Sequence, residues 1–253
     1  SGRGSIVVLD VFCGCGGNSI AFARLNNNGE KKEDDNDVQQ QDAPRVKVIA
    51  VDNNLSRLKM AANNARIYGI DKEDIVFIHA DAVEVLNCYN KGARSGNEDS
   101  STRKDSANDT FAGFALGGIE LLPDNVDGIF LSPPWGGMDY GNSGGKTGFD
   151  PVSSITVEST LEDGAVRNEE NAKTTVTTNG GELLSISAKA VLKTSKQEGA
   201  IAYFLPRNTN GISMGQIAVA SGIEGCFEME QNVVNGKVKT VTAYFGQGVE
   251  CLL

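Results

Sequence analysis

The sequence predicts an α/β fold in which a mostly parallel β-sheet is flanked by helices and ends in an antiparallel hairpin. Three observations support this prediction. Short, nearly continuous β-branched runs alternate with stretches of helical character, as in a parallel sheet that is covered on both faces. A glycine-rich segment follows the first run, where a strand would pass into a helix. Asn235-Gly236 separates the last two runs and is a strong hairpin signal.

The expected elements follow one another along the chain of 253 residues. The parallel strands are predicted at Ile6–Val11, Val46–Val51, Ile75–His79, Val126–Leu131 and Ala200–Leu205. Helices are predicted at Gly17–Leu25, Leu55–Tyr68, Ala82–Cys88, Leu183–Lys193 and Ile212–Ala220. The hairpin is predicted from Cys226–Val234 and Lys237–Phe245. This order of elements is typical of class I methyltransferases, which have a Rossmann-like fold.

We interpret residues 1–253 as a single domain that carries three polar insertions. The insertions lie near 26–43, 90–125 and 153–181. They contain low-complexity stretches rich in Asn, Ser, Thr and charged residues, which bury too little apolar surface to offset the entropy lost on ordering, so we expect surface segments. Their formal charges of −4, −2 and −3 make up nearly all of the chain's −10. The acidity therefore does not exclude a nucleic-acid partner.

Composition also excludes several classes of function. The single histidine, His79, lies in an apolar strand-like run, which argues against Ser-His-Asp catalysis and His-rich zinc sites, and we expect no metal. Five cysteines without C-x-x-C spacing predict reduced thiols. No apolar run approaches the roughly 18 residues of a membrane span, and the first residues lack a signal-peptide pattern. We expect a soluble, intracellular protein with no membrane partner.

The segment Asp10–Asn18, which reads Asp-Val-Phe-Cys-Gly-Cys-Gly-Gly-Asn, joins the first strand to the first helix. Glycines at this point let a ligand approach the backbone, and a helix N-terminus favours an anionic group. Asp52 closes the second strand, where a carboxylate can accept hydrogen bonds from ribose hydroxyls. Asp52 follows Gly14 by 38 positions, and by 20 once the tract 26–43 is set aside. That separation matches nucleotide-binding α/β folds.

Asp81 follows the third strand, where it can meet an adenine amino group or cap the next helix. A dinucleotide-binding dehydrogenase would show Gly-x-Gly-x-x-Gly, whereas this loop reads Gly14-x-Gly16-Gly17-Asn18. Taken alone, the segment leaves three interpretations open: a site for S-adenosylmethionine, a site for a nicotinamide or flavin cofactor, and a structural turn.

A second motif, Ser132-Pro133-Pro134-Trp135, follows the fourth predicted strand. The two prolines stiffen the loop and lack N–H donors, which leaves carbonyl oxygens free to accept hydrogen bonds. Acceptors around Ser132 and Pro133 can hold the hydrogens of an exocyclic amino group and direct its lone pair at a methyl donor, so that catalysis is mostly positioning. Trp135 supplies a flat face for stacking a base. The alternative is a proline-rich turn before a core tryptophan.

Longer motifs resemble the trimethylguanosine synthase family. The matching segments are Asp10–Asn18, Ser132–Tyr140, Phe149-Asp150, Tyr203–Asn208 and Glu230–Gly246. They run from the first strand to the last and skip only the three polar tracts. The resemblance implies S-adenosylmethionine as cofactor, bound by Asp10, Phe12, Gly14, Gly16, Asn18, Asp52 and Asp81.

The resemblance further implies methylation of guanine N2 in a 7-methylguanosine cap, giving 2,2,7-trimethylguanosine on small nuclear and nucleolar RNAs. Capped RNA is then the partner of a monomeric protein in the nucleus, with the cytoplasm as a second location. The implied catalytic residues are Ser132, Pro133, Pro134 and Trp135, and the implied substrate-binding residues are Trp135, Asp139, Tyr140, Arg207 and Asn208. A cationic 7-methylguanine stacked on Trp135 would gain about 0.5 to 2 kcal/mol of cation–π attraction.

Two other functions are consistent with the motifs. One is a guanine-N2 or adenine-N6 methyltransferase acting on internal rRNA or DNA positions, which would have to flip its target base. The other is a catalytically silent cap-binding module. The family carries a helical segment upstream of the first strand that folds over cofactor and cap, whereas Ser1-Gly2 stand immediately before that strand here. Without that segment we expect weaker binding of both ligands.

Overall fold

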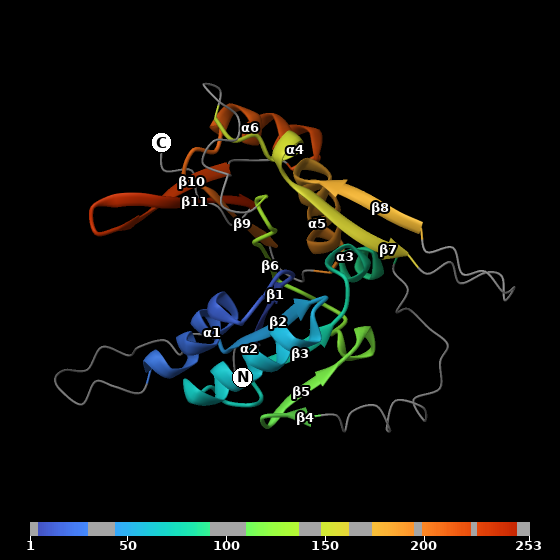
Figure 1. Ribbon diagram of the computed structural model, residues 1–253, viewed down its shortest axis with the longest axis vertical. Helices are drawn as coiled ribbons and strands as arrows, with labels where there is room; N and C mark the ends of the chain where they lie inside the picture. Colours follow the sequence, from blue (N-terminus) through green and yellow to red (C-terminus); the bar gives the residue numbers. More distant parts are fainter. Residues whose placement is uncertain are drawn as a thin grey trace, which may run out of the picture.

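A nine-stranded sheet with the order β10-β11-β9-β6-β1-β2-β3-β5-β4 runs through the computed structural model (Figure 1). The structure describes residues 5–29, 44–91, 110–136, 148–161, 174–194, 199–223 and 227–246. The strands of this sheet are β1 (Ile6–Asp10), β2 (Val46–Asp52), β3 (Ile75–His79), β4 (Thr110–Phe111), β5 (Phe114–Gly117), β6 (Gly128–Leu131), β9 (Ala200–Pro206), β10 (Phe227–Val234) and β11 (Lys237–Gly246).

Most neighbouring strands in this sheet are parallel. β1 pairs in parallel with β2 and with β6, and parallel pairing continues from β2 to β3, from β3 to β5 and from β6 to β9. β11 is antiparallel to both β9 and β10, and β10 and β11 form the hairpin predicted from Asn235-Gly236. Both residues of that turn have positive φ, 52° and 71°, as a tight hairpin turn requires. The predicted architecture is therefore confirmed.

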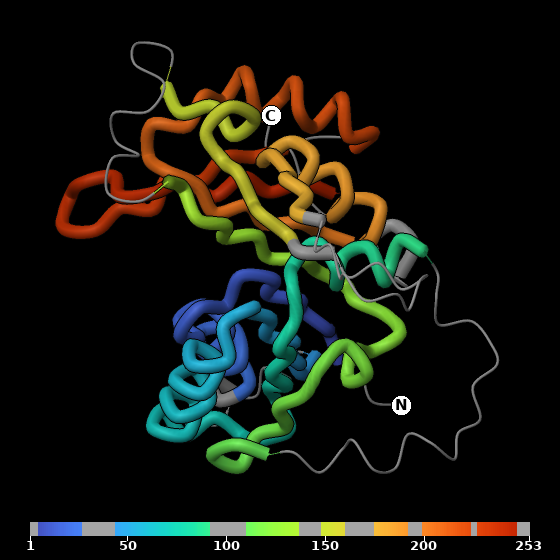
Figure 2. The backbone as a smooth tube through the Cα atoms, turned by 45° about the vertical axis from the view of Figure 1, so that its right-hand side comes forward, coloured from blue at the N-terminus to red at the C-terminus, as the bar shows by residue number. Residues whose placement is uncertain are grey.

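Helices cover both faces of the sheet (Figure 2). One face carries α1 (Gly17–Ala23) and α2 (Leu55–Ile67), and the other carries α3 (Ala82–Lys91), α5 (Gly180–Thr194) and α6 (Gly211–Ala220). A short helix of four residues, α4 (Pro151–Ser154), precedes a separate two-stranded sheet of β7 (Thr156–Leu161) and β8 (Thr174–Asn179). Strand β2 is buried from Val48 to Asp52, which explains its continuous apolar sequence.

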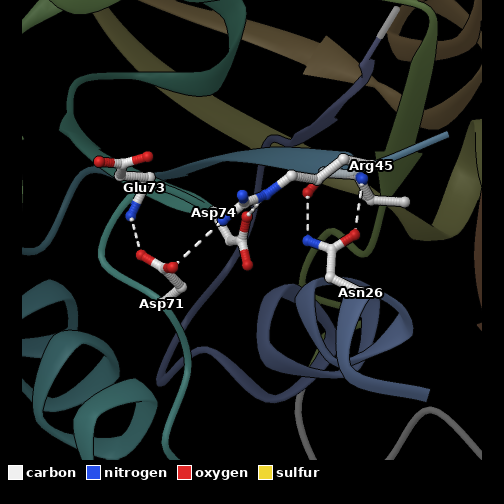
Figure 3. Close-up of polar contacts among 6 residues, drawn as sticks. Asn26, Arg45, Asp71, Glu73 and Asp74 are labelled. Carbon is white, nitrogen blue, oxygen red and sulfur yellow. Dashed lines mark hydrogen bonds and ion pairs between the residues drawn. The ribbon is translucent and has the colours of Figure 1, made fainter. Parts of the chain in front are cut away.

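Most predicted boundaries agree with the structure to within a few residues. β3 matches its prediction, whereas β6 begins at Gly128 rather than Val126. The first helix ends at Ala23 instead of Leu25 and continues as a 3-10 helix over Arg24–Gly29. This 3-10 helix carries Asn26, whose side chain donates to the Val46 carbonyl at 2.8 Å and accepts the Val46 N–H at 2.7 Å (Figure 3).

Both described flanks of the first polar tract are fastened by polar contacts: Asn26 binds the start of β2, and Arg45, directly before β2, binds the segment that precedes β3 (Figure 3). The Arg45 guanidinium binds Asp74 at 2.6 Å and Asp71 at 3.2 Å. Asp74 is buried, and the pKa of Asp71 lies below its ordinary value because its carboxylate accepts the Glu73 N–H and lies near Arg45. These contacts are at the amino end of β2, opposite the strand end that carries Asp52.

The other two polar tracts contain ordered elements that the sequence did not predict. β5 and a 3-10 turn, Ile119–Leu121, lie within 90–125, and β7 and β8 lie within 153–181. Phe114 and Leu116 of β5 are buried against β3, and Val157 of β7 belongs to the larger hydrophobic core. The expectation of surface insertions is therefore wrong for these parts. Residues 30–43, 92–109 and 162–173 lie outside the described residues.

Candidate active site

The residues singled out from the sequence line the carboxyl edge of the sheet in the order of its strands. Asp81 follows β3, Asp52 ends β2, the glycine-rich loop follows β1, and Ser132 follows β6. β1 has β2 on one side and β6 on the other, so the strand order reverses at β1. Open α/β sheets bind their ligands at such a switch point.

The glycine-rich loop is held against β2 by a hydrogen bond to the Asp52 side chain. Gly14 has a φ of 54° and donates its N–H to Asp52 Oδ2 at 3.0 Å. Gly16 has a φ of 86°, and a Cβ there would lie 2.9 Å from the Ala61 side chain of α2, so only glycine fits. Gly14 and Gly17 differ from Gly16 in this respect, because a Cβ on either of them would meet nothing within 4 Å. Open space over the loop is therefore available to a ligand.

Asp52 is a structural anchor of this loop. Its side chain is 7% exposed, and its Oδ1 accepts the Asn54 N–H at 2.8 Å and lies 3.3 Å from Arg57 Nε. With Gly14 on Oδ2, both carboxylate oxygens already have donors. Ribose hydroxyls would therefore share this carboxylate with the protein, and replacing Asp52 would disturb the loop as well as any ligand.

Asp10 is a fully buried acid directly before the glycine-rich loop. Ser19 Oγ donates to its Oδ2 at 2.7 Å, while Oδ1 has no hydrogen-bond partner among the described residues. Burial raises the pKa of Asp10 to about 6, although the Ser19 bond acts in the opposite direction. A cationic group nearby would favour the ionised carboxylate. The sequence singled out Asp10 but gave no indication that Ser19 supports it.

Asp81 caps helix α3. Its Oδ1 accepts the N–H groups of Val83 at 2.8 Å and Glu84 at 3.1 Å, which is the capping role considered from the sequence. The same oxygen accepts a third hydrogen bond, from Ser159 Oγ of β7, at 2.9 Å. Ser159 could not be identified from the sequence because it lies in a tract interpreted as an insertion.

Ser132 contacts the loop that follows β1. Its hydroxyl donates to the Phe12 carbonyl at 3.2 Å, which ties the carboxyl ends of β6 and β1 together. With its proton committed in this way, the Ser132 oxygen presents only lone pairs to any other group. Pro133 is buried and Pro134 is exposed, so the two prolines differ in environment.

Trp135 is fixed to the neighbouring strand β9. Its indole Nε1 donates to the Phe204 carbonyl at 3.2 Å, and the two rings pack with centroids 5.4 Å apart at 38°. Phe204 in turn contacts Phe130, which packs edge-on against Phe22 of α1. Trp135 is only partly buried, so this row of rings holds the indole in place without enclosing it.

The loop after β9 meets the segment that precedes α4. Phe149 donates its N–H to the Asn208 carbonyl at 2.8 Å, and its own carbonyl accepts the Asn210 N–H at 2.8 Å. Gly148 has a φ of 84°, and a Cβ there would lie 2.7 Å from the Asn208 carbonyl. Arg207 is exposed beside this junction.

The remaining predicted site residues are not part of these contacts. Asn18 is exposed on α1. Asp139 and Tyr140 lie outside the described residues. A cleft of about 410 Å³ near the end of β3 includes none of the predicted site residues; its lining is Leu55, Lys59, His79, Thr110, Phe111, Leu116, Gly117 and Gly118.

Comparison with known proteins assigns the family. Residues 5–248 match the family model described as RNA cap guanine-N2 methyltransferase. The chain belongs to this family. It is 26% identical over 141 residues to the trimethylguanosine synthase of Schizosaccharomyces pombe, a match that covers 56% of the chain and 37% of that relative.

The fold of this family member is that of class I methyltransferases, as predicted. A solved S-adenosylmethionine-dependent methyltransferase from Agrobacterium tumefaciens superposes with a TM-score of 0.54 at 11% identity. The superposition covers 97% of the chain and 57% of the Agrobacterium protein. At this identity, the likeness concerns the fold alone.

Proposed function

We propose that this chain transfers methyl groups from S-adenosylmethionine to guanine N2 of a 7-methylguanosine RNA cap. The product would be the 2,2,7-trimethylguanosine cap of small nuclear and nucleolar RNAs. The observation that carries the proposal is Ser132, whose hydroxyl proton is committed to the Phe12 carbonyl at the strand-order switch. Family membership supports the choice of base and atom.

The glycine-rich loop and its neighbours fit S-adenosylmethionine. The open space over Gly14 and Gly17 admits the methionine end of the cofactor, and the incompletely satisfied Asp10 carboxylate suits its positive charge. Asp52 and Asp81 would accept hydrogen bonds from the ribose and the adenine. When bound, the cofactor supplies an electrophilic methyl group on a sulfonium. The residues of the chain then only have to bring a nucleophile to that methyl group.

The Ser132 loop suits an amino nitrogen as that nucleophile. An exocyclic amino group is weakly nucleophilic because its lone pair is delocalised into the ring. Hydrogen bonds from the amino group to the Ser132 oxygen and to the Pro133 carbonyl would localise that lone pair. Since the Phe12 carbonyl fixes the Ser132 hydroxyl as a donor, its oxygen can only accept from the substrate. Catalysis by this loop is therefore positioning, without a strong base. The nitrogen would bond to the methyl carbon as the carbon–sulfur bond breaks, the neutral thioether would leave, and the methylated nitrogen, which is strongly acidic while it carries the extra proton, would release that proton to water.

Trp135 would select the methylated cap. Its indole is fixed by Phe204 and remains partly exposed, so it can stack on a base with little reorganisation. The positive charge of 7-methylguanine adds a cation–π attraction that unmethylated guanine lacks. Arg207, exposed beside the Asn208 junction, would bind the cap phosphates. We further propose that the protein acts as a monomer in the nucleus.

The proposal is tested by a methyl-transfer assay with radiolabelled S-adenosylmethionine on three substrates. These are a 7-methylguanosine cap dinucleotide, the same dinucleotide without the N7 methyl group, and rRNA. We expect transfer to the methylated cap alone. Transfer to rRNA would favour an enzyme for internal bases, and cap binding without transfer would favour a silent binding module.

A further inference from the structure

The separate β7–β8 hairpin contacts the proposed cofactor site through one buried side chain. We infer that Ser159 of β7 is a positioning residue, which orients the Asp81 carboxylate toward the adenine of the cofactor. The inference rests on the proposed function, because it assigns a role to a residue of the same site. It gives the hairpin a part in ligand binding, although its sequence resembles a polar insertion.

Strand β7 lies against the core with one face. Ile155, just before the strand, and Val157 and Ser159 within it are 0%, 7% and 2% exposed, while Thr156 and Glu158 are exposed. This alternation is that of a half-buried strand. Ile155 and Val157 join the hydrophobic core that includes α3 and α5. The next inward position is a serine, where an apolar residue would continue the pattern.

A buried hydroxyl at this position needs a hydrogen-bond partner, and that partner is Asp81. Ser159 Oγ donates to Asp81 Oδ1 at 2.9 Å, between residues 78 positions apart in the chain. Capping of α3 already supplies two donors to the same oxygen, from Val83 and Glu84. The third donor is therefore not required to cap the helix. Its effect is to hold the plane of the carboxylate.

The arrangement leaves the other carboxylate oxygen for a ligand. All three hydrogen bonds that Asp81 accepts within the described residues go to Oδ1. Oδ2 thus remains an acceptor at the end of β3, where Asp81 is half-buried. An adenine amino group is a donor that can pair with it. Loss of the Ser159 bond would let the carboxylate rotate and weaken this pairing.

Ser159→Ala tests the inference, with Ser187→Ala as the matched control. Ser187 is also fully buried, but its hydroxyl donates to the Leu183 carbonyl within its own helix at 2.8 Å. We expect Ser159→Ala to weaken S-adenosylmethionine binding by about 3- to 10-fold in calorimetry, the size of one hydrogen bond. Ser187→Ala should lower the melting temperature without changing that affinity. In turnover, KM for the cofactor should rise while kcat and KM for the cap stay unchanged.

A double-variant cycle separates positioning from support of the fold. In an Asp81→Asn background, Ser159→Ala should change cofactor affinity by less than 2-fold, because the carboxylate that it orients is gone. Additive losses, or equal affinities for Ser159→Ala and Ser187→Ala, would overturn the inference while leaving the proposed function intact. If the wild-type chain binds no S-adenosylmethionine, both the role of Ser159 and the proposed function are wrong. Ser159→Thr, which keeps the hydroxyl, should restore binding if Ser159→Ala folds poorly.

Discussion

At the carboxyl edge of the sheet, single side chains have separate roles in the proposed chemistry, and contacts with neighbouring residues constrain each of them. Ser132 has its proton fixed by Phe12, Trp135 has its ring fixed by Phe204, and Asp10 is buried with one oxygen incompletely satisfied. None of these contacts could be deduced from the motifs alone. The motifs identify the residue types, but hydrogen-bond direction depends on which neighbouring strand the loop meets.

Ser132→Ala should reduce kcat more than it raises KM. The lost acceptor would contribute mainly when the amino lone pair attacks, so we expect about a 5- to 30-fold fall in kcat with less than a 3-fold change in KM for the cap. Steady-state kinetics on the methylated cap dinucleotide measure this directly. A change confined to KM would show that Ser132 only binds the substrate.

Trp135 variants should separate stacking from charge recognition. Trp135→Ala should weaken binding of a 7-methylguanosine cap analogue by about 10-fold or more, because it removes the stacking surface. Trp135→Phe should weaken binding of this analogue less. It should also reduce the ratio of affinities for the methylated and unmethylated analogues, because phenylalanine has a weaker cation–π surface. Isothermal titration calorimetry measures the affinity of both variants, because it does not depend on tryptophan fluorescence. Unaltered cap affinity in Trp135→Ala would exclude stacking at this residue.

Asp10 should give the ligand-free protein a pH-dependent stability. Its folded pKa of about 6 lies above the ordinary value of 3.8, so folding favours the protonated form. The contribution is complete below about pH 4 and is lost as the pH rises through about 6, with a total on the order of 1 to 3 kcal/mol. Asp10→Asn should flatten this dependence in denaturation at pH 4 to 8.

Cofactor binding should favour the ionised form of Asp10, whereas folding without ligand favours the protonated form. A cationic ligand group beside the carboxylate favours its ionised form, so affinity for S-adenosylmethionine should rise as the pH increases from 5 to 7. Affinity that is independent of pH in this range, with Asp10→Asn unchanged, would remove Asp10 from the cofactor site.

At the scale of elements, the sequence predicted the strands and helices that are long or continuously apolar. β1, β2, β3 and β9 are short apolar runs with clear ends, and α2 begins at the Asn54 cap. β5 and β7 were missed because each lies beside a stretch of Ser, Thr, Asn and charged residues, which weakens its own pattern. The role of Ser159 was missed for the same reason.

The polar tracts should therefore respond differently to shortening. Replacing 30–43 by a short Gly-Ser link, with Asn26 and Arg45 retained, should leave the melting temperature and turnover nearly unchanged, because longer loops add little entropic cost and both flanks are fastened at the amino end of β2. Replacing 155–179 should abolish cofactor binding, since it removes Ile155, Val157 and Ser159 from the core. Thermal unfolding and calorimetry compare the two deletions.

For the molecule as a whole, strand order brings the two proposed half-sites together. The loops after β1 and β6 are adjacent because β6 pairs with β1 although 117 residues separate the end of one from the start of the other. The Ser132–Phe12 hydrogen bond joins these loops at the switch point. The proposed cofactor side would then extend over β2 and β3, and the proposed base side over β9. On this proposal, a methyl donor and a cap would lie on opposite sides of one hydrogen bond.

The most direct test of this account is the position of the transferred methyl group. The protein is incubated with methyl-labelled S-adenosylmethionine and a 7-methylguanosine cap dinucleotide, and the digested nucleosides are separated by mass spectrometry. The account predicts label on guanine N2, in 2,7-dimethylguanosine and then in 2,2,7-trimethylguanosine. Label on another atom, or equal labelling of a cap without the N7 methyl group, would contradict it.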